Sequence, residues 1–254
     1  MDTPYYDFPD RPFFNKVSLY PEGYAPEDYI TSYALKVGSD DKSILRLGCG
    51  WNDNSRRLVE HYGRVYNVDD NPAVIEKFKL ITRTIPEMHV CLSVDGSIPF
   101  YDNFFDVILS PRGPMFSKPS IFSEVVRVLR PGGYLIATVT GEKDLLDIKK
   151  SMGRGFNFHG GDFLESVGNR IDMLNHKLGG PMDTLVFKDF SFEEVYTDRE
   201  SLVRFLESFP VITDFDYGDP LDRKLLDAYM DENATPDGIK VHRQVFFWVG
   251  KRRW

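Results

Sequence analysis

The sequence predicts an α/β fold built around a parallel β-sheet with helices on both faces. Between residues 43 and 141, short apolar runs alternate with segments of helical spacing, which is the pattern of repeated strand–helix–strand units. The apolar runs are nearly continuous, as expected for parallel strands that are covered on both faces. The length of 254 residues and the 42% hydrophobic content suffice for one large domain, or for one domain with an inserted subdomain.

Five strands and two helices are expected in this core. A helix follows the second strand, because Asn71 is a good N-cap, Pro72 suits the first helical position, and apolar residues then recur at helical spacing. A second helix, with apolar residues at helical spacing from 121 to 129, is expected to end before Pro131-Gly132-Gly133. The expected strands span residues 43–47, 64–69, 89–94, 105–109 and 134–139.

The regions around the core, which we take as residues 43–142, have other roles. Residues 1–42 are rich in aromatic residues and proline and predict an N-terminal arm or cap, with one helix near 26–37. Residues 143–200 include a glycine-rich stretch and predict a lid or insertion. Residues 201–254 are expected to complete the sheet. Further elements are expected as helices over 143–152, 162–176, 198–208 and 220–231, and strands over 184–197 and 241–249.

Composition and charge limit the partners and the compartment. The formal net charge of −8 disfavours nucleic acid as a partner, because an acidic surface repels phosphate backbones. No apolar run reaches the roughly 20 residues of a membrane helix, and the N-terminus does not resemble a signal peptide. Cys49 and Cys91 form no paired motif, which favours a reducing, cytoplasmic compartment. The five histidines show no metal-ligand spacing, so we expect no metal site.

Two features at neighbouring strand ends indicate a ligand. The first strand turns through Gly48-Cys49-Gly50, where missing Cβ atoms let the backbone approach a bound group, although such a turn can also be purely structural. Asp69 ends the next strand about 20 residues later, where a carboxylate can accept hydrogen bonds from ribose hydroxyls. Alternatively, Asp69 or Asp70 caps the following helix. Asn52 occupies the place of a later glycine in the dinucleotide fingerprint, which argues against nicotinamide and flavin cofactors.

Two more segments complete a pattern that resembles a known family. Val94 to Phe100 contains Asp95-Gly96 at a strand end, where the carboxylate either accepts from an adenine amino group or forms a turn. Glu124 to Leu135 is a helix closed by proline and two glycines before a strand. In this order and spacing, the four segments together resemble the class I methyltransferases, specifically their type 11 group, over residues 43–141.

The resemblance implies a Rossmann-like, doubly wound sheet of seven strands, mostly parallel, with an antiparallel last strand. It also implies the cofactor S-adenosyl-L-methionine, with Gly48 and Gly50 under the methionine and ribose, Asp69 on the ribose hydroxyls and Asp95 near the adenine. Ser110, after the fourth strand, would face the reactive methyl group. The residues expected to bind the cofactor are Arg46, Gly48, Cys49, Gly50, Asp69, Asp70, Asp95, Gly96 and Ser110.

Three departures from the family pattern concern the cofactor end of the site. Arg46 stands where the family usually has an acidic residue that helps hold the cofactor's amino group, Asn52 replaces a glycine, and the segment from Asp95 to Pro99 is one residue short. A buried arginine needs a partner. Either Arg46 pairs structurally with a neighbouring carboxylate, or it alters cofactor binding. The candidate partners are Asp69, Asp95, Asp106 and the cofactor's own carboxylate.

The resemblance favours a methyltransferase that positions an O, N or C nucleophile of a small molecule in line with the methyl group. The alternatives are an RNA-base methyltransferase and a cofactor-binding subunit with weak or no activity. No general base is assigned. The N-terminal arm and the segment 143–200 are expected to form the acceptor pocket, unless the arm merely packs on the back of the sheet. The candidate substrate contacts are Tyr5, Tyr6, Phe14, Tyr20, Arg112 and His159.

Overall fold

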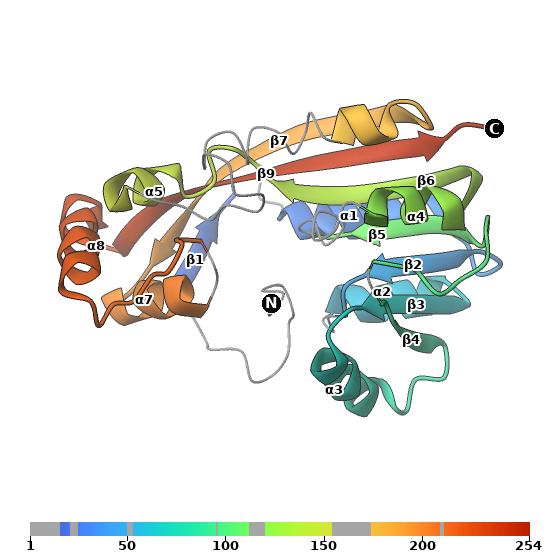
Figure 1. Ribbon diagram of the computed structural model, residues 1–254, viewed down its shortest axis with the longest axis horizontal. Helices are drawn as coiled ribbons and strands as arrows, with labels where there is room; N and C mark the ends of the chain where they lie inside the picture. The colour runs from blue at the N-terminus through green and yellow to red at the C-terminus, as the bar shows by residue number, and fades with distance from the viewer. Residues whose placement is uncertain are drawn as a thin grey trace.

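A computed structural model describes most of the chain, and it has a long sheet with helices on both faces (Figure 1). The described residues are 16–20, 25–49, 53–94, 96–111, 120–153, 174–208 and 211–254. None of the helices in these ranges is both long and apolar enough to cross a membrane.

The sheet confirms the predicted doubly wound α/β fold. The core strands are β2 (Ser43–Leu47), β3 (Arg64–Asp69), β4 (Met88–Leu92), β5 (Phe105–Ser110) and β6 (Leu129–Thr140). They are parallel to one another, in the spatial order β6-β5-β2-β3-β4. Beyond β6 lie β9 (Gly238–Arg252) and β7 (Met182–Tyr196), and β9 runs antiparallel to both of its neighbours. The last strand is therefore antiparallel, as expected.

The described part of the sheet has nine strands rather than the seven expected. The reason is the length of β7 and β9, which pair with each other from Met182↔Arg252 to Tyr196↔Ile239. The pairing of β6 with β9 ends at Thr140↔Val245, so Gly238–Gln244 of β9 continue past the end of β6 with β7 as their long neighbour. At about 3.4 Å per residue, this two-stranded extension is about 24 Å long. Two short strands pair with it, β1 (Lys16–Leu19) and β8 (Ala234–Thr235).

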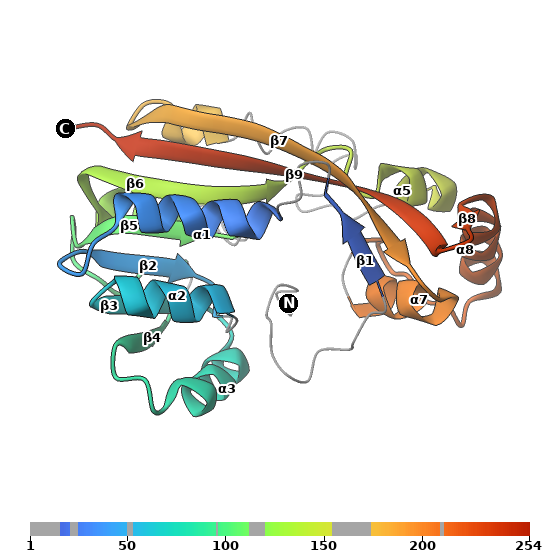
Figure 2. The ribbon, with the colours of Figure 1, turned by 180° about the vertical axis from the view of Figure 1, so that it is seen from behind.

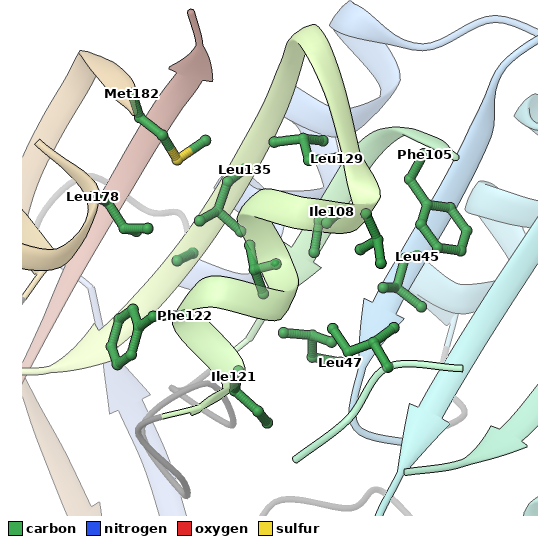
Figure 3. Close-up of a cluster of buried hydrophobic side chains, with 14 of the residues drawn as sticks. Leu45, Leu47, Phe105, Ile108, Ile121, Phe122, Leu129, Leu135, Leu178 and Met182 are labelled. Carbon is green, nitrogen blue, oxygen red and sulfur yellow. The ribbon is translucent and has the colours of Figure 1, made fainter. Parts of the chain in front are cut away.

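Helices cover both faces of the core sheet. On one face lie α1 (Pro26–Val37), α2 (Asp53–His61) and α3 (Pro72–Thr82), as Figure 2 shows. On the other face lie α4 (Ser120–Val128) and the helical residues 174–178. Figure 3 shows the apolar side chains of β2, β5 and α4 packed together there. The predicted N-cap is confirmed, because Asn71 Oδ1 accepts from the backbone N of Ala73 and Val74.

A second hydrophobic core lies around the β7–β9 extension. It is made by α5 (Leu146–Met152), α7 (Arg199–Ser208), α8 (Pro220–Glu232) and the outer ends of β7 and β9. We call these helices, the β7–β9 extension, β1 and β8 the distal lobe. Figure 1 shows the distal lobe on the side to which the core strands point. Its residues bury their own apolar side chains, including Tyr196, Leu202, Leu226 and Met230, so the lobe has an independent core.

The flanking segments contain several of the expected elements. The helix over 26–37 is confirmed. In the segment 143–200, the helix expected over 143–152 and the strand expected over 184–197 are confirmed as α5, which packs in the distal core, and β7, which belongs to the sheet. Residues 154–173 lie outside the described residues, as do 1–15 of the arm. The described part of the arm supplies one edge strand, β1, and the helix α1.

Candidate functional site

The strand order reverses beside β2, which places a candidate site at the carboxyl ends of β2, β3 and β5. From β2 the chain proceeds outward to β3 and β4 on one side, and then returns to β5 and β6 on the other. In open α/β sheets, ligands bind at such a switch point, outside the carboxyl ends of the strands. The distal lobe extends from the same edge, because the β7–β9 extension begins where β6 ends.

Gly48 makes the turn at the end of β2. Its φ is +89°, a conformation that L side chains rarely adopt, and its N donates to the carbonyl of Val68 on β3 at 2.7 Å. A side chain at this position would add strain to a turn that is also tied to the neighbouring strand. The turn is therefore specified by glycine and brings the backbone after β2 against the end of β3.

Asp69 joins the ends of β2 and β3. Its Oδ2 accepts from the backbone N of Cys49 at 3.0 Å, and its Oδ1 accepts from the backbone N of Asn71 at 2.9 Å. The carboxylate is only 4% exposed, and the cap of α3 is supplied by Asn71. Asp69 therefore orients both turns at the switch point. Asp70, the next residue, is exposed.

Arg46 lies on β2 beside Asn67 of β3 and Leu109 of β5. Its Nη1 donates to Ser55 Oγ in the first turn of α2 at 2.5 Å. The expected partner Asp106 is engaged elsewhere, because it accepts from Arg130 and from Ser43 at the amino ends of the strands. Arg46 is thus positioned between the sheet and α2, close to the candidate site.

Cys49, between the two glycines, is buried and has a thiol pKa well above its ordinary value. Burial is the main cause; the Asp69 carboxylate also raises the pKa, and the Arg46 guanidinium opposes the rise. A thiol that stays protonated is a poor nucleophile. Cys49 is therefore structural, and the candidate site gains no covalent chemistry from it.

Ser110 ends β5 with a buried hydroxyl that has no hydrogen-bond partner among the described residues. Leaving a buried polar group unsatisfied costs about 1–3 kcal/mol, so native proteins usually provide a partner. A ligand lying over the strand ends would supply a partner for the Ser110 hydroxyl.

On the other side of the switch point, Gly96 has a φ of +79° in a tight turn closed by the Val94↔Ser97 bridge.

The structure brings together part of the predicted set. Gly96 follows β4, and six other predicted residues lie at the carboxyl ends of β2, β3 and β5. These six are Arg46, Gly48, Cys49, Asp69, Asp70 and Ser110. Tyr20 contacts Phe192 of β7 in a tilted arrangement, with ring centroids 4.7 Å apart, and packs in the core with α1. The remaining predicted residues lie outside the described residues; these are Gly50, Asp95, Tyr5, Tyr6, Phe14, Arg112 and His159.

Sequence reasoning missed a buried ionic cluster at the base of the distal lobe. Arg243 on β9 contacts Asp144, which follows β6, and Glu194 on β7. Glu194 also accepts from Lys16 on β1 at 2.8 Å. In the sequence, Arg243 lies between His242 and Gln244 in the strand expected over 241–249, and its neighbours along the chain do not indicate its partners. No group of three or more His, Cys, Asp or Glu within the described ranges could hold a metal ion.

A shallow pocket of about 410 Å³ lies at the other edge of the sheet, at the start of β3 and β4. Its lining residues are Gly63, Arg64, Tyr66, Pro86, Glu87 and His89. Because ligands of open α/β sheets bind at the carboxyl edge, the switch point remains the better candidate.

Comparisons with known proteins concern mainly the core sheet. A family model described as "Methyltransferase domain" matches residues 45–137, which run from within β2 to within β6. In overall fold, a protein of unknown function from Deinococcus radiodurans R1 resembles this chain with a TM-score of 0.62. The two are 15% identical, and the match covers 94% of this chain and 92% of that protein.

Two curated relatives each match less than half of this chain. A phthiotriol/phenolphthiotriol dimycocerosates methyltransferase of Mycobacterium ulcerans is 34% identical over 122 residues, which cover 44% of this chain and 43% of that protein. A 2-methyl-6-phytyl-1,4-hydroquinone methyltransferase of Synechocystis is 32% identical over 126 residues, or 46% of this chain and 39% of that protein. The match thus spans less than half the length of each relative.

Proposed function

We propose that this chain, whose residues 45–137 match a family model described as "Methyltransferase domain", is an S-adenosylmethionine-dependent methyltransferase that acts on a small molecule. The observation that carries the proposal is the buried Asp69 carboxylate, held by the backbone N–H groups of Cys49 and Asn71 at the switch point. A carboxylate fixed in this way can accept the hydroxyls of a ribose without reorganisation.

The residues present fit the cofactor. Gly48 would let the cofactor approach the protein backbone at the end of β2, Asp69 would accept its ribose hydroxyls, and the Ser110 hydroxyl would gain the partner that it lacks among the described residues. Asp70 and the turn at Gly96 border the same edge. When bound, S-adenosylmethionine supplies an electrophilic methyl group on a sulfonium. The chain's own task is then to orient the acceptor and to exclude water, which needs no catalytic triad or metal.

The acceptor is proposed to be a small molecule held between the switch point and the distal lobe. Two relatives are named as methyltransferases of phthiotriol-type lipids and of a phytyl hydroquinone, which supports a small or lipid-like acceptor. The net charge of −8 opposes an RNA substrate. The distal lobe rises from the carboxyl edge of the sheet, where it can form the far wall of an acceptor site.

Calorimetry with S-adenosylhomocysteine tests the proposal. The protein should bind this ligand, and Asp69→Ala should weaken binding by about 30- to 150-fold, equivalent to about 2–3 kcal/mol for charge-assisted hydrogen bonds. Asp102→Ala is the matched control, because Asp102 is an exposed carboxylate before β5 that pairs with Arg127. Absence of binding to the unmodified protein would refute the proposed function.

A further inference from the structure

The pocket at the amino ends of β3 and β4 is separate from the switch point. Its volume of about 410 Å³ lies within the range of about 300–1,000 Å³ that small-molecule sites occupy. Arg64 begins β3 and lines the pocket, whereas Asp69 ends the same strand at the switch point. At about 3.3 Å per residue, the strand separates the two places by about 16 Å. A ligand in the pocket therefore leaves the switch point free.

Two opposite charges lie side by side at the start of these strands. Val65 pairs with Met88, and the backbone N of Val65 donates to the carbonyl of Glu87 at 2.9 Å, so Arg64 and Glu87 are neighbours across the two chains. Both side chains are exposed, and neither forms an ion pair or a side-chain hydrogen bond with another residue in the described ranges. The pocket thus offers one cation and one anion to the same ligand.

Aromatic rings line the pocket next to these charges. Tyr66 of β3 and His89 of β4 are paired in the sheet, and their rings stack with centroids 4.9 Å apart and planes inclined by 26°. The Tyr66 ring also makes edge contacts with Phe100 and Phe104, at centroid distances of 5.2 and 5.6 Å. These contacts fix its position. A fixed pair of rings is a suitable surface for a flat, apolar ligand group.

The lining limits which ligands fit the pocket. A ligand with only an anion would be attracted by Arg64 but repelled by Glu87, and a ligand with only a cation would meet the reverse. A zwitterion can satisfy both residues. Arg64 and Tyr66 are two positions apart on β3, or about 7 Å along the strand. The charges of the ligand must therefore lie a short spacer away from its ring.

We propose that this pocket is a second ligand site, which binds a small zwitterion with an aromatic ring, the chemistry of an aromatic α-amino acid. Arg64 binds the carboxylate, Glu87 binds the ammonium, and Tyr66 and His89 hold the ring. This site does not depend on methyl transfer, because its residues lie at the edge of the sheet opposite the switch point.

NMR titrations of the full chain, with its backbone amides as reporters, test the assignment. The probe is L-phenylalanine, and three relatives each lack one feature: phenethylamine the carboxylate, 3-phenylpropanoate the ammonium and L-alanine the ring. L-phenylalanine should bind with a Kd on the order of 1 mM and shift the amides of residues 63–66 and 87–89. The two relatives with one charge should bind about 2- to 5-fold more weakly, and L-alanine at least about 10-fold more weakly.

Two substitutions assign the charges separately. Arg64→Gln should abolish the preference for L-phenylalanine over phenethylamine but keep the preference over 3-phenylpropanoate, and Glu87→Gln should do the reverse. His89→Ala should weaken every ligand that carries the ring. Arg204→Gln and Glu207→Gln are the matched controls, because both side chains are exposed on α7 in the distal lobe. They should leave all four affinities unchanged.

Saturation with S-adenosylhomocysteine separates this pocket from the switch point, because that ligand itself contains an amino acid. L-phenylalanine should bind equally well in its presence. Competition between the two ligands, or amide shifts centred on the carboxyl ends of β2 and β3, would overturn the inference. The same holds for no response at about ten times the expected Kd, and for unchanged preferences in both charge variants. Failure to bind S-adenosylhomocysteine would refute only the proposed function, since the comparison of the four probes does not require it.

Discussion

Arg243 Nη1 donates to Glu194 Oε2 across the β7–β9 extension at 2.6 Å. The same guanidinium donates through Nε to Asp144 Oδ1 at 2.8 Å, and all three side chains are at most 11% exposed. Lys16 of β1 provides the second positive charge, so two cations face two carboxylates. The cluster joins β1, β7, β9 and the turn after β6 where the distal lobe leaves the sheet.

The first prediction concerns the removal of this central cation. Arg243→Met should destabilise the fold by about 3–5 kcal/mol, because Asp144 and Glu194 would remain buried without their main partner. Urea-induced unfolding measures the free energy. The control is Arg199→Met on α7, whose guanidinium is about half-exposed and pairs with Asp231. It should cost less than about 1 kcal/mol. Equal losses in the two variants would contradict the prediction.

The second prediction is a pH dependence of stability that arises from Glu194. Burial alone would raise the pKa of Glu194, but Arg243 and Lys16 outweigh it and lower the pKa to about 2 from its ordinary value of 4.5. A lowered folded-state pKa means that the ionised carboxylate stabilises the fold. The contribution is complete above about pH 4.5 and is lost as the pH falls toward 2.

Unfolding experiments between pH 6 and pH 2 test this dependence. The unmodified protein should lose on the order of 3 kcal/mol through this one group across that window. Glu194→Gln should be less stable than the unmodified protein at pH 6 and should show a smaller loss on acidification. Glu207→Gln provides a comparison, because this exposed carboxylate on α7 should leave the pH profile unchanged. Parallel profiles for all three proteins would exclude Glu194 as the source.

The elements with strong local signals were predicted from the sequence, including the helices α5, α7 and α8, whereas the assembly of the distal lobe was not. The helix over 26–37 and the Asn71 cap follow from periodicity and from a side chain that bonds its own helix. The distal lobe depends on distant pairings. Arg243 meets Asp144 from 99 residues away, and β1 pairs with β7. No local pattern encodes such contacts, and the lengths of β7 and β9 are decided by them.

The candidate site was predictable for a related reason. Gly48 and Asp69 belong to turns whose geometry depends on residue type, and their spacing of about 20 residues reflects one strand–helix–strand unit. Arg46 was recognised as a departure from the family pattern, but its contact with Ser55 nine residues later was not predicted. A side chain with five donors has many candidate partners, and only the fold selects among them.

The third prediction separates strain from ligand contact at Gly48. Gly48→Ala should lower the free energy of unfolding by about 1–2 kcal/mol, because the φ of Gly48 is +89°. It should also weaken the binding of S-adenosylhomocysteine by more than this loss of stability explains. Gly153→Ala is the control. Gly153 also has a positive φ, +64°, but an added Cβ would meet nothing within 4 Å, and the residue follows α5 in the distal lobe. It should lose stability without losing affinity, as measured by thermal unfolding and calorimetry.

The fourth prediction concerns the buried hydroxyl of Ser110. Ser110→Ala should leave the stability of the ligand-free protein unchanged or slightly raised, because it removes a buried polar group that has no partner among the described residues. Ser43→Ala is the matched control, since the Ser43 hydroxyl donates to the carbonyl of Phe104 at 2.9 Å. It should lose about 1 kcal/mol.

Ligand titration then distinguishes a contact with the cofactor from a packing defect at the same place. If the Ser110 hydroxyl bonds the ligand, Ser110→Ala should bind S-adenosylhomocysteine about 2- to 10-fold more weakly, as expected for one neutral hydrogen bond. Ser43→Ala should bind it normally despite its lower stability, because Ser43 begins β2 at the edge opposite the site. A loss of stability in Ser110→Ala with unchanged affinity would instead place the hydroxyl's partner within the protein, and the end of β5 would then be no ligand contact.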